Sequence, residues 1–437
     1  MSQPAPSAWD QPAPSPVNQL AQHLASQLTT PNPQHARRPA PTPVTEDVPR
    51  LLTQWQAIAV TACVLFGIFG ALFQLLAWQA TGRAADNTEQ LVRVQQIQAS
   101  LFRADALATN AFLTGGLEQA TQRAEYDAAL DEVLRKIADA AEAQPADRAV
   151  LADLNTTVSA YVAGITQARD NNRQGFPIGA QYLREAGATL RDDAVPILDA
   201  LVTANTLRAE DEMDGQNTLP LFLAGLAAVV VLWWVNRQMA RRFRRRFNVG
   251  LMFAALAIAV VTVVGVISSS GKSADNDDLR AGSLREAISE SSARTAANDA
   301  KAKESARLIA RGSGAATEPD WQELAQEVTE TASPETLPLF LTYVGLHEDL
   351  VAQDDAGAWN AAVELATSTE PGSSSAALTA FDRASQGVVE QAATDTTDSL
   401  RSGGVVAVLL TILTLLVGLG AAGAATWGVN QRRKEYS

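Results

Sequence analysis

"TLPLFLAGLAAVVVLWWVNRQMARRFRRRFNVGLMFAALAIAVVTVVGVIS", residues 218–268, contains two apolar blocks on either side of a short arginine-rich segment. Neither block contains Asp, Glu, Lys or Arg. Each holds about 17–25 mostly apolar residues, which is enough to cross a hydrocarbon core about 30 Å thick. A buried helix of a soluble protein rarely stays uncharged on every side for that long. The stretch therefore predicts two membrane-spanning helices joined by a short loop.

Two further blocks, residues 51–80 and 403–429, are equally apolar and uncharged. The sequence thus predicts four transmembrane helices in a multi-pass protein of the cell membrane. The first block follows about fifty mostly polar residues, too many for a secretory signal, so we interpret it as a retained anchor.

The charges beside the spans predict their orientation. Short basic segments stay on the cytoplasmic side, so the loop between the second and third spans and both termini are expected inside. Attraction to anionic lipid accounts for this basic loop, and a docking site for a cytoplasmic partner is the alternative. The arginines concerned are Arg237, Arg241, Arg242, Arg244, Arg245 and Arg246.

The resulting organisation has two long segments outside the membrane and three short ones inside. In chain order it comprises a disordered proline-rich cytoplasmic tail (1–50), a span (51–80), an extracytoplasmic four-helix bundle (81–217), a span (218–235), a cytoplasmic arginine-rich loop (236–248), a span (249–269), a second extracytoplasmic helical bundle (270–402), a span (403–429) and a cytoplasmic tail (430–437).

The first outer segment has apolar residues at alternating spacings of three and four, the signature of packed helices. Four such helices with short connections predict an antiparallel four-helix bundle. Pro196 is expected to kink the fourth helix. The expected inward-facing residues are Val94, Ile97, Leu101, Ala104, Ala108 and Ala111 in the first helix, Leu130, Val133, Leu134 and Ile137 in the second, Leu151, Leu154, Val158, Tyr161, Ile165 and Ala168 in the third, and Leu183, Leu190, Ala194, Ile197 and Leu201 in the fourth.

The second outer segment repeats this outline less regularly. "GRAADN" (82–87) and "GKSADN" (271–276) each open an outer segment directly after a span, which favours a tandem repeat of one unit. A long helix over about 271–311, shorter helices and a return helix over about 375–402 are predicted. The acidic residues outside, and His347 in "GLHEDL", are expected on solvated surfaces.

The N-terminal tail is rich in proline and is predicted to be disordered. One island, "VNQLAQHLASQL", places Val17, Leu20, Leu24 and Leu28 along one helical face. It is either a transient helix in a floppy tail or a recruitment helix for a cytoplasmic partner.

Motifs for chemistry are missing from the sequence. No P-loop, GxSxG or dinucleotide-binding fingerprint occurs. His23 and His35 lie in the cytoplasmic tail and His347 lies in an outer segment, so no histidine cluster for zinc is expected. The protein is expected not to be an enzyme, to hold no cofactor or metal, and to bind no nucleic acid. The uncharged spans also argue against transport, because carriers need polar groups at mid-membrane.

A span, an outer four-helix bundle and a second span together resemble chemoreceptor-type sensor modules, here in tandem. The chain as a whole resembles the GlnX family, the four-span membrane component of an actinobacterial amino-acid sensing system. The preference for arginine over lysine and the abundance of alanine are consistent with a GC-rich actinobacterial genome. The stretches that carry the resemblance are the proline-rich start, "WWVNRQMARRFRRRFN" (233–248), "GKSADNDDLRAGSLREAI" (271–288) and "WGVNQRRKEYS" (427–437).

The resemblance implies signal transduction through partners. An extracytoplasmic glutamate/aspartate-binding lipoprotein, GlnH, would be read by the outer bundles, and a soluble Ser/Thr kinase, PknG, would receive the signal. Helices continuous with a span can transmit sliding, tilt or rotation, because packed bundles prefer discrete arrangements. A sensor that binds a small molecule directly and a membrane scaffold without a signal remain alternatives, and a homodimer is left open.

Overall fold

The computed structural model describes residues 48–114, 120–214, 218–243 and 248–433. Every regular element in these ranges is helical and none is a strand, which confirms the all-α prediction. The tail expected to be disordered lies outside the described residues, except for residues 48–50, where α2 begins.

Four helices are long and apolar enough to cross a membrane, as predicted. Much of their apolar surface is exposed in the protein alone, so the bilayer would cover it. The helices that contain these spans are α2 (Val48–Leu113), α7 (Leu219–Phe243), α8 (Val249–Ala281) and α14 (Gly404–Arg433).

Small residues let α14 approach both α2 and α8 closely. A Cβ atom on Gly418 of α14 would lie only 2.5 Å from the Cα atom of Gly67 in α2. A Cβ atom on Gly428 would lie 2.9 Å from the Cα atom of Gly250 in α8. The glycine-rich segment of the last span therefore packs backbone against backbone, the usual role of small residues between membrane helices.

The first bundle consists of the part of α2 beyond residue 80 together with α3–α6. Its apolar core draws on all of its long helices, and the predicted inward face of the third helix is buried throughout. Leu134 was expected inside but is 39% exposed. The bounds are α3 (Ala120–Ala143), a 3-10 turn (Pro145–Asp147), α4 (Arg148–Arg173), α5 (Ile178–Ala188), a π turn (Thr189–Ala194) and α6 (Val195–Asp214).

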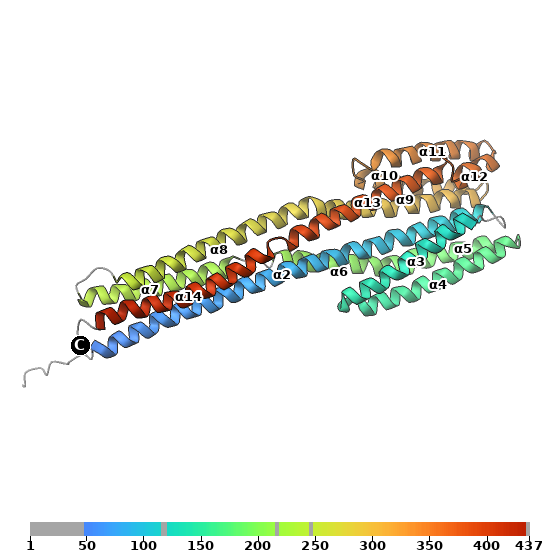
Figure 1. Cartoon of the computed structure of the whole chain (residues 1–437). Coiled ribbons are helices and arrows are strands. Elements are labelled where there is room, and N and C mark those ends of the chain that lie inside the picture. Colours follow the sequence, from blue (N-terminus) through green and yellow to red (C-terminus); the bar gives the residue numbers. More distant parts are fainter. Residues whose placement is uncertain (1–47, 115–119, 215–217, 244–247, 434–437) are drawn as a thin grey trace, which may run out of the picture. The chain divides into compact units, whose positions relative to one another are not determined.

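The second bundle consists of α9–α13 and also follows the predicted order of a long helix, shorter helices and a return helix (Figure 1). Gly282 separates α8 from α9, and Gly312, at φ +79°, follows the end of α9. The bounds are α9 (Ser283–Ile309), a 3-10 turn (Gly314–Thr317), α10 (Glu318–Thr331), α11 (Leu337–Asp355), α12 (Trp359–Thr367) and α13 (Ser374–Arg401).

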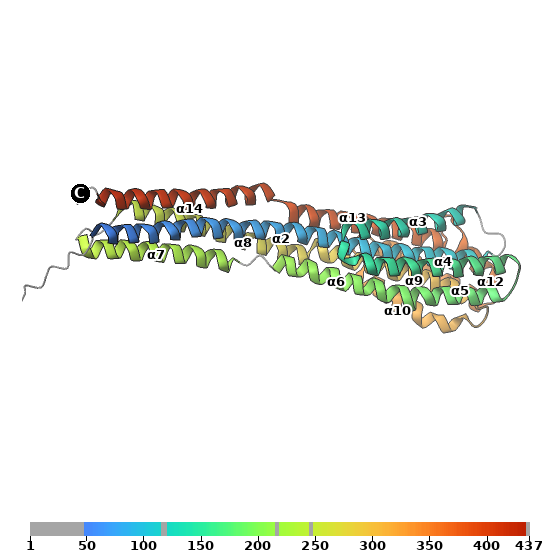
Figure 2. The ribbon, with the colours of Figure 1, turned by 90° about the horizontal axis from the view of Figure 1, so that it is seen from below.

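The two bundles pack against each other along α2, α9 and α13, which lie side by side (Figures 1 and 2). Val92 of α2 is buried with Ala287 of α9 and Val389 of α13. Nearer the spans, Ala84 and Leu91 of α2 are buried with Leu400, the penultimate residue of α13. The bundles therefore share an interface that includes the helices leading to the spans.

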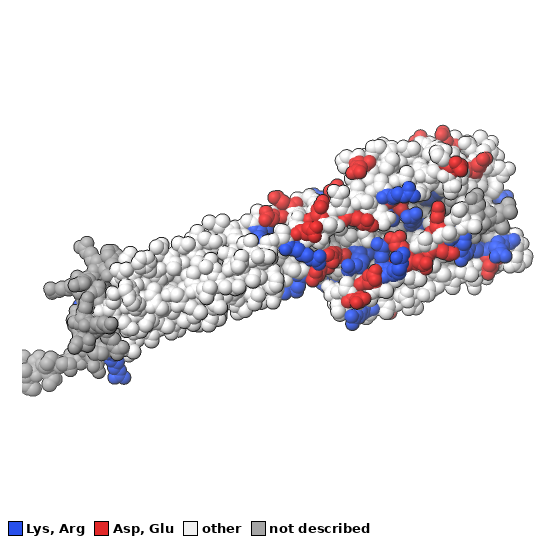
Figure 3. Space-filling view, in the orientation of Figure 1, with Lys and Arg blue, Asp and Glu red and all other residues white. Residues whose placement is uncertain are grey.

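Charged residues are distributed as the spans require. On the face shown in Figure 3, Lys, Arg, Asp and Glu gather over the bundles, whereas the surface of the spans between their ends carries none. Because burying a charge in hydrocarbon is costly, this boundary marks the level at which the membrane would end.

Candidate functional site

Three of the arginines predicted as a docking site, Arg237, Arg241 and Arg242, lie at the end of α7 that points away from the bundles (Figure 1). Arg237 stacks over the Trp233 ring at 5.3 Å and Arg242 over the Trp55 ring at 5.9 Å, while Arg241 is exposed. Such contacts anchor the end of a span and do not by themselves form a binding site. The predicted residues that lie outside the described part of the chain are Arg244, Arg245, Arg246, Leu20, Leu24 and Leu28.

A polar contact between the two bundles is centred on Asp105 of α2, which is buried. The Arg191 Nη2 atom donates to Asp105 Oδ2 at 3.0 Å and also to Oδ1 of Asp299 in α9. The Tyr161 hydroxyl donates to Asp105 Oδ1 at 3.2 Å. One guanidinium of the first bundle thus joins a carboxylate of its own bundle to a carboxylate of the second.

Arg191 projects from the π turn Thr189–Ala194. Pro196 lies two residues beyond this turn, at the second position of α6. Because proline lacks an N–H and clashes with the carbonyl four residues earlier, the regular helical hydrogen bond cannot form there. The irregularity expected at Pro196 therefore takes the form of a widened turn. Such turns inside α-helices occur frequently at functional sites.

A second polar contact between the bundles is centred on Asp382 of α13, which is 2% exposed. Arg294 of α9 donates to both of its carboxylate oxygens, at 2.7 and 3.2 Å, and Asn298 donates to Oδ1 at 3.0 Å. Arg103 of α2 donates to Asp382 Oδ2 at 2.9 Å. We call this group and the Asp105 group the inter-bundle clamps, since α2 supplies a residue to each.

The pKa values of the two clamp carboxylates, Asp105 and Asp382, are shifted in opposite directions. Burial raises the pKa of Asp105, and although Arg191 counteracts this effect, the negative charge of Asp299 adds to it. Burial would also raise the pKa of Asp382, but Arg294 and Arg103 together hold that pKa below its ordinary value. The Asp382 clamp is thus fully ionic at neutral pH, whereas the charge on Asp105 is poorly compensated.

A buried polar network lies deeper in the second bundle. The Lys301 Nζ atom donates to Glu304 Oε1 at 2.6 Å, to the carbonyl oxygen of Ala366 at 2.8 Å and to the Ser374 hydroxyl at 2.6 Å. His347 Nδ1 lies 3.0 Å from Glu304 Oε2. Burial alone would raise the pKa of Glu304, but Lys301 and His347 lower it to about 2.

The expectation that His347 lies on the surface was wrong. Its side chain is 1% exposed, and its ring stacks on Trp321 with centroids 3.6 Å apart and planes 8° apart. The Trp321 ring and the Glu304 carboxylate replace the contacts that the His347 imidazole would make with water. The expectation that the outer acidic residues lie on solvated surfaces likewise fails for Glu290, Glu304 and Asp382, which are at most 2% exposed, but most acidic residues of the second bundle are exposed.

The signal for these buried charges was present in the sequence. Six residues of α9, spaced alternately four and three apart, form one face of this helix, and each is at most 2% exposed. A charged residue at a core-facing position of a helix must be buried and paired. A search for periodic apolar residues misses such positions because it does not count charged side chains. The residues on this face are Glu290, Arg294, Ala297, Lys301, Glu304 and Leu308.

Comparison with known proteins adds one match. Residues 80–214 match the family model described as the actinobacterial sensor domain. The match covers the first bundle, from the end of the first span to the end of α6. No curated protein and no solved structure matches the chain. With its four apolar helices, the chain has the makeup of a multi-pass membrane protein with a sensor role.

Proposed function

We propose that this protein relays the state of an extracytoplasmic glutamate/aspartate-binding lipoprotein to a cytoplasmic Ser/Thr kinase. Both bundles lie outside the cell membrane, and both termini and the arginine-rich loop lie in the cytoplasm. The lipoprotein and the kinase correspond to GlnH and PknG of the family that the chain resembles. The match of the first bundle to a sensor domain supports the sensing half of this proposal.

The observation that carries the relay is the continuity of α2. This helix runs from its span into the first bundle without a break, and its residues Arg103 and Asp105 belong to the inter-bundle clamps. A continuous helix passes sliding or rotation along its length. A change at the outer end of the first bundle would therefore reach the membrane along α2.

The inter-bundle clamps extend this movement to the second bundle. Their partners lie on α9 and α13, which lead to the spans in α8 and α14. Interfaces of this kind switch between discrete arrangements by exchanging ion-pair partners. Arg191, held between Asp105 and Asp299, has two carboxylates between which such an exchange can occur.

The test uses the full-length protein in lipid nanodiscs with purified GlnH and PknG. We expect kinase association to differ between GlnH with and without glutamate. Asp299→Asn should bind both partners but lose that difference, because it weakens the clamp without touching an outer surface. Asp320→Asn, on an exposed residue of α10, is the matched control and should behave as wild type.

Two results would contradict the relay. Absence of GlnH binding in either ligand state would remove its input. Stabilisation of the full-length protein by glutamate alone, measured as a rise in melting temperature, would favour a direct small-molecule sensor.

A further inference from the structure

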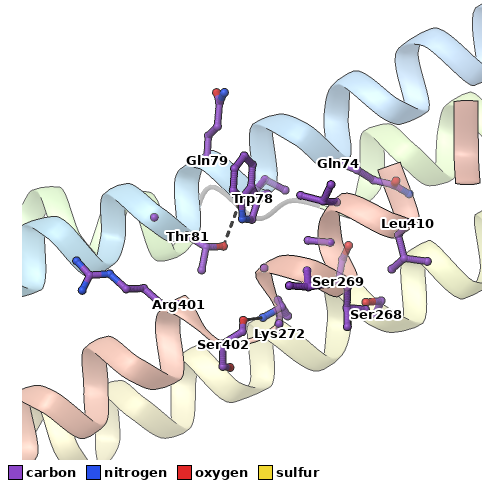
Figure 4. A pocket seen from close by; sticks show the side chains of 18 of the residues that line it. Gln74, Trp78, Gln79, Thr81, Ser268, Ser269, Lys272, Arg401, Ser402 and Leu410 are labelled. Carbon is purple, nitrogen blue, oxygen red and sulfur yellow. Dashed lines mark hydrogen bonds between the residues drawn. The ribbon is translucent and has the colours of Figure 1, made fainter. Parts of the chain in front are cut away.

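A cavity of about 1000 Å³ lies where the bundles meet the spans (Figure 4). Its walls come from α2, α8, the end of α13 and the start of α14, with α7 contributing at one side. This volume is at the upper end of the range of small-molecule sites, about 300–1,000 Å³. The cavity belongs to neither of the inter-bundle clamps.

The cavity exists because the return helix is interrupted. α13 ends at Arg401 and α14 begins at Gly404, and Gly403 between them has φ +76°, a conformation that favours glycine. Lys272 of α8 reaches across to this break, where its Nζ atom donates to the carbonyl oxygen of Ser402 at 2.9 Å. The interruption thus holds a lysine beside the opening between the helices.

The lining changes from charged to apolar along the cavity. The charged end lies on the bundle side and the apolar end extends between the spans. Trp78, which is 41% exposed, lines the cavity between them, as expected of an aromatic residue at the membrane boundary. The charged end contains Arg83, Asp86, Lys272 and Arg401. The apolar end contains Phe73, Ala77, Val406 and Leu410.

The charged end has a spare positive charge. Arg401 pairs with Asp86 and Glu89, and Arg83 pairs with Glu212. Lys272 instead contacts a neutral carbonyl oxygen and forms no ion pair with a carboxylate in the described part of the chain. An anion that entered the cavity would meet this ammonium group without displacing an existing ion pair.

We propose that this cavity binds an anionic phospholipid of the bilayer. The phosphate group contacts Lys272, and an acyl chain lies along Phe73, Ala77 and Val406. The position at the membrane boundary, the apolar length and the unpaired ammonium together fit a molecule with a negative head and a hydrocarbon tail. Basic pockets between membrane helices on the cytoplasmic side of other proteins bind lipid head groups by the same attraction between a basic side chain and a phosphate. A free anion would leave the apolar end unfilled.

The test is direct lipid binding and does not depend on the proposed signalling function. Full-length protein in detergent is titrated with phosphatidylglycerol or phosphatidylcholine, and bound lipids are counted by native mass spectrometry. Lys272→Gln should weaken phosphatidylglycerol binding about fivefold, the effect of one basic residue beside an anionic head group, and leave phosphatidylcholine binding unchanged. Ala77→Trp should fill the cavity and remove binding of the tightly held lipid.

Matched controls separate the cavity from the rest of the surface. Lys303→Gln removes a lysine of the second bundle, and Ala227→Trp adds an indole on an exposed position of α7 outside the cavity. Both should bind lipid as wild type does. Wild-type phosphatidylglycerol binding by both Lys272→Gln and Ala77→Trp would overturn the proposal. Displacement of phosphatidylglycerol by inorganic phosphate would also overturn it, since the site would then recognise a free anion.

Discussion

The two bundles are similar in outline but bury different kinds of side chain. The first has a continuous core of Leu, Ile, Val and Ala with one phenylalanine, Phe102, and two tyrosines. In the second, four alanines of α9 pack with an aromatic group formed by Trp321, Phe340, Tyr343 and Phe381, and α9 also carries buried charges. The first bundle is thus held mainly by apolar packing, although it also buries Asp147, which pairs with Arg208 at 2.8 Å. The second bundle combines packing with several buried ion pairs.

This difference affects how specific each structure is. Apolar burial is non-directional, so it specifies the arrangement of the helices less strictly than paired charges do. A buried ion pair adds little net stability compared with well-packed apolar residues, but breaking it by removing one partner is strongly destabilising. We infer that the second bundle supports one arrangement at the interface, while the first can adjust against it.

The largest effect is expected from breaking an ion pair of the second bundle. Asp382→Ala leaves Arg294 buried without a countercharge, so the bundle should lose about 3–5 kcal/mol of stability. Hydrogen exchange across α9 and α13 would measure the loss. Asp395→Ala, on an exposed position of α13, is the control and should change little. A small loss for Asp382→Ala would contradict the role of ion pairs.

Removing apolar packing from the first bundle should have a somewhat smaller effect. Leu154 is fully buried in α4, and Leu154→Ala should cost about 3 kcal/mol through lost burial and a cavity. Leu207→Ala, at a residue that is 55% exposed on α6, serves as control. Faster hydrogen exchange confined to the first bundle is expected. Equal loss in both bundles would show that they unfold as one.

Acid should affect the bundles in opposite directions. The pKa of Glu304 is lowered to about 2 from 4.5, so its contribution is present above pH 4.5 and is lost as the pH falls towards 2. The pKa of Asp105 is raised, so its protonation relieves a penalty as the pH falls through that raised value. Exchange at pH 7 and pH 3, corrected for intrinsic rates, should show the second bundle weakening relative to the first. Glu304→Gln and Asp105→Asn should reduce this difference.

The smallest effect is expected from an exposed pair beside the spans. Arg83 and Glu212 are 52% and 27% exposed, and Arg83→Gln should change stability by less than about 1 kcal/mol. Thermal unfolding in detergent would measure it. A loss as large as that of Asp382→Ala would mean that exposure does not distinguish the two kinds of pair.

Apolar periodicity predicted the helical architecture well because most helices bury an apolar stripe. The predicted faces of α2 and α4 are buried, and the spans lie in helices at the predicted places. Leu134 was wrongly placed inside because adjacent Val133 and Leu134 cannot both point inward, and periodicity alone does not choose between them.

The polar sites were not predicted, for a physical reason. Asp105 and Arg191 each follow a predicted core residue by one position, so periodicity places them beside the core without indicating a partner. Asp299 and Asp382 lie on other helices, and only tertiary packing brings them within hydrogen-bonding distance. The cavity beside Lys272 depends on the break at Gly403, whose conformation the sequence alone does not specify.

The unbroken course of α2 limits how the length of this protein can change. One inserted residue between Trp55 and Arg103 would turn all subsequent side chains of α2 by about 100° around the helix axis relative to the preceding ones. Either the side chains of the span would then lose their packing partners, or Arg103 would turn away from Asp382. An insertion of about seven residues, two helical turns, would nearly restore the phase. The junction at Ser402–Gly403 is not helical and could absorb a single residue. Single-residue insertions should therefore be tolerated at that junction and not within α2.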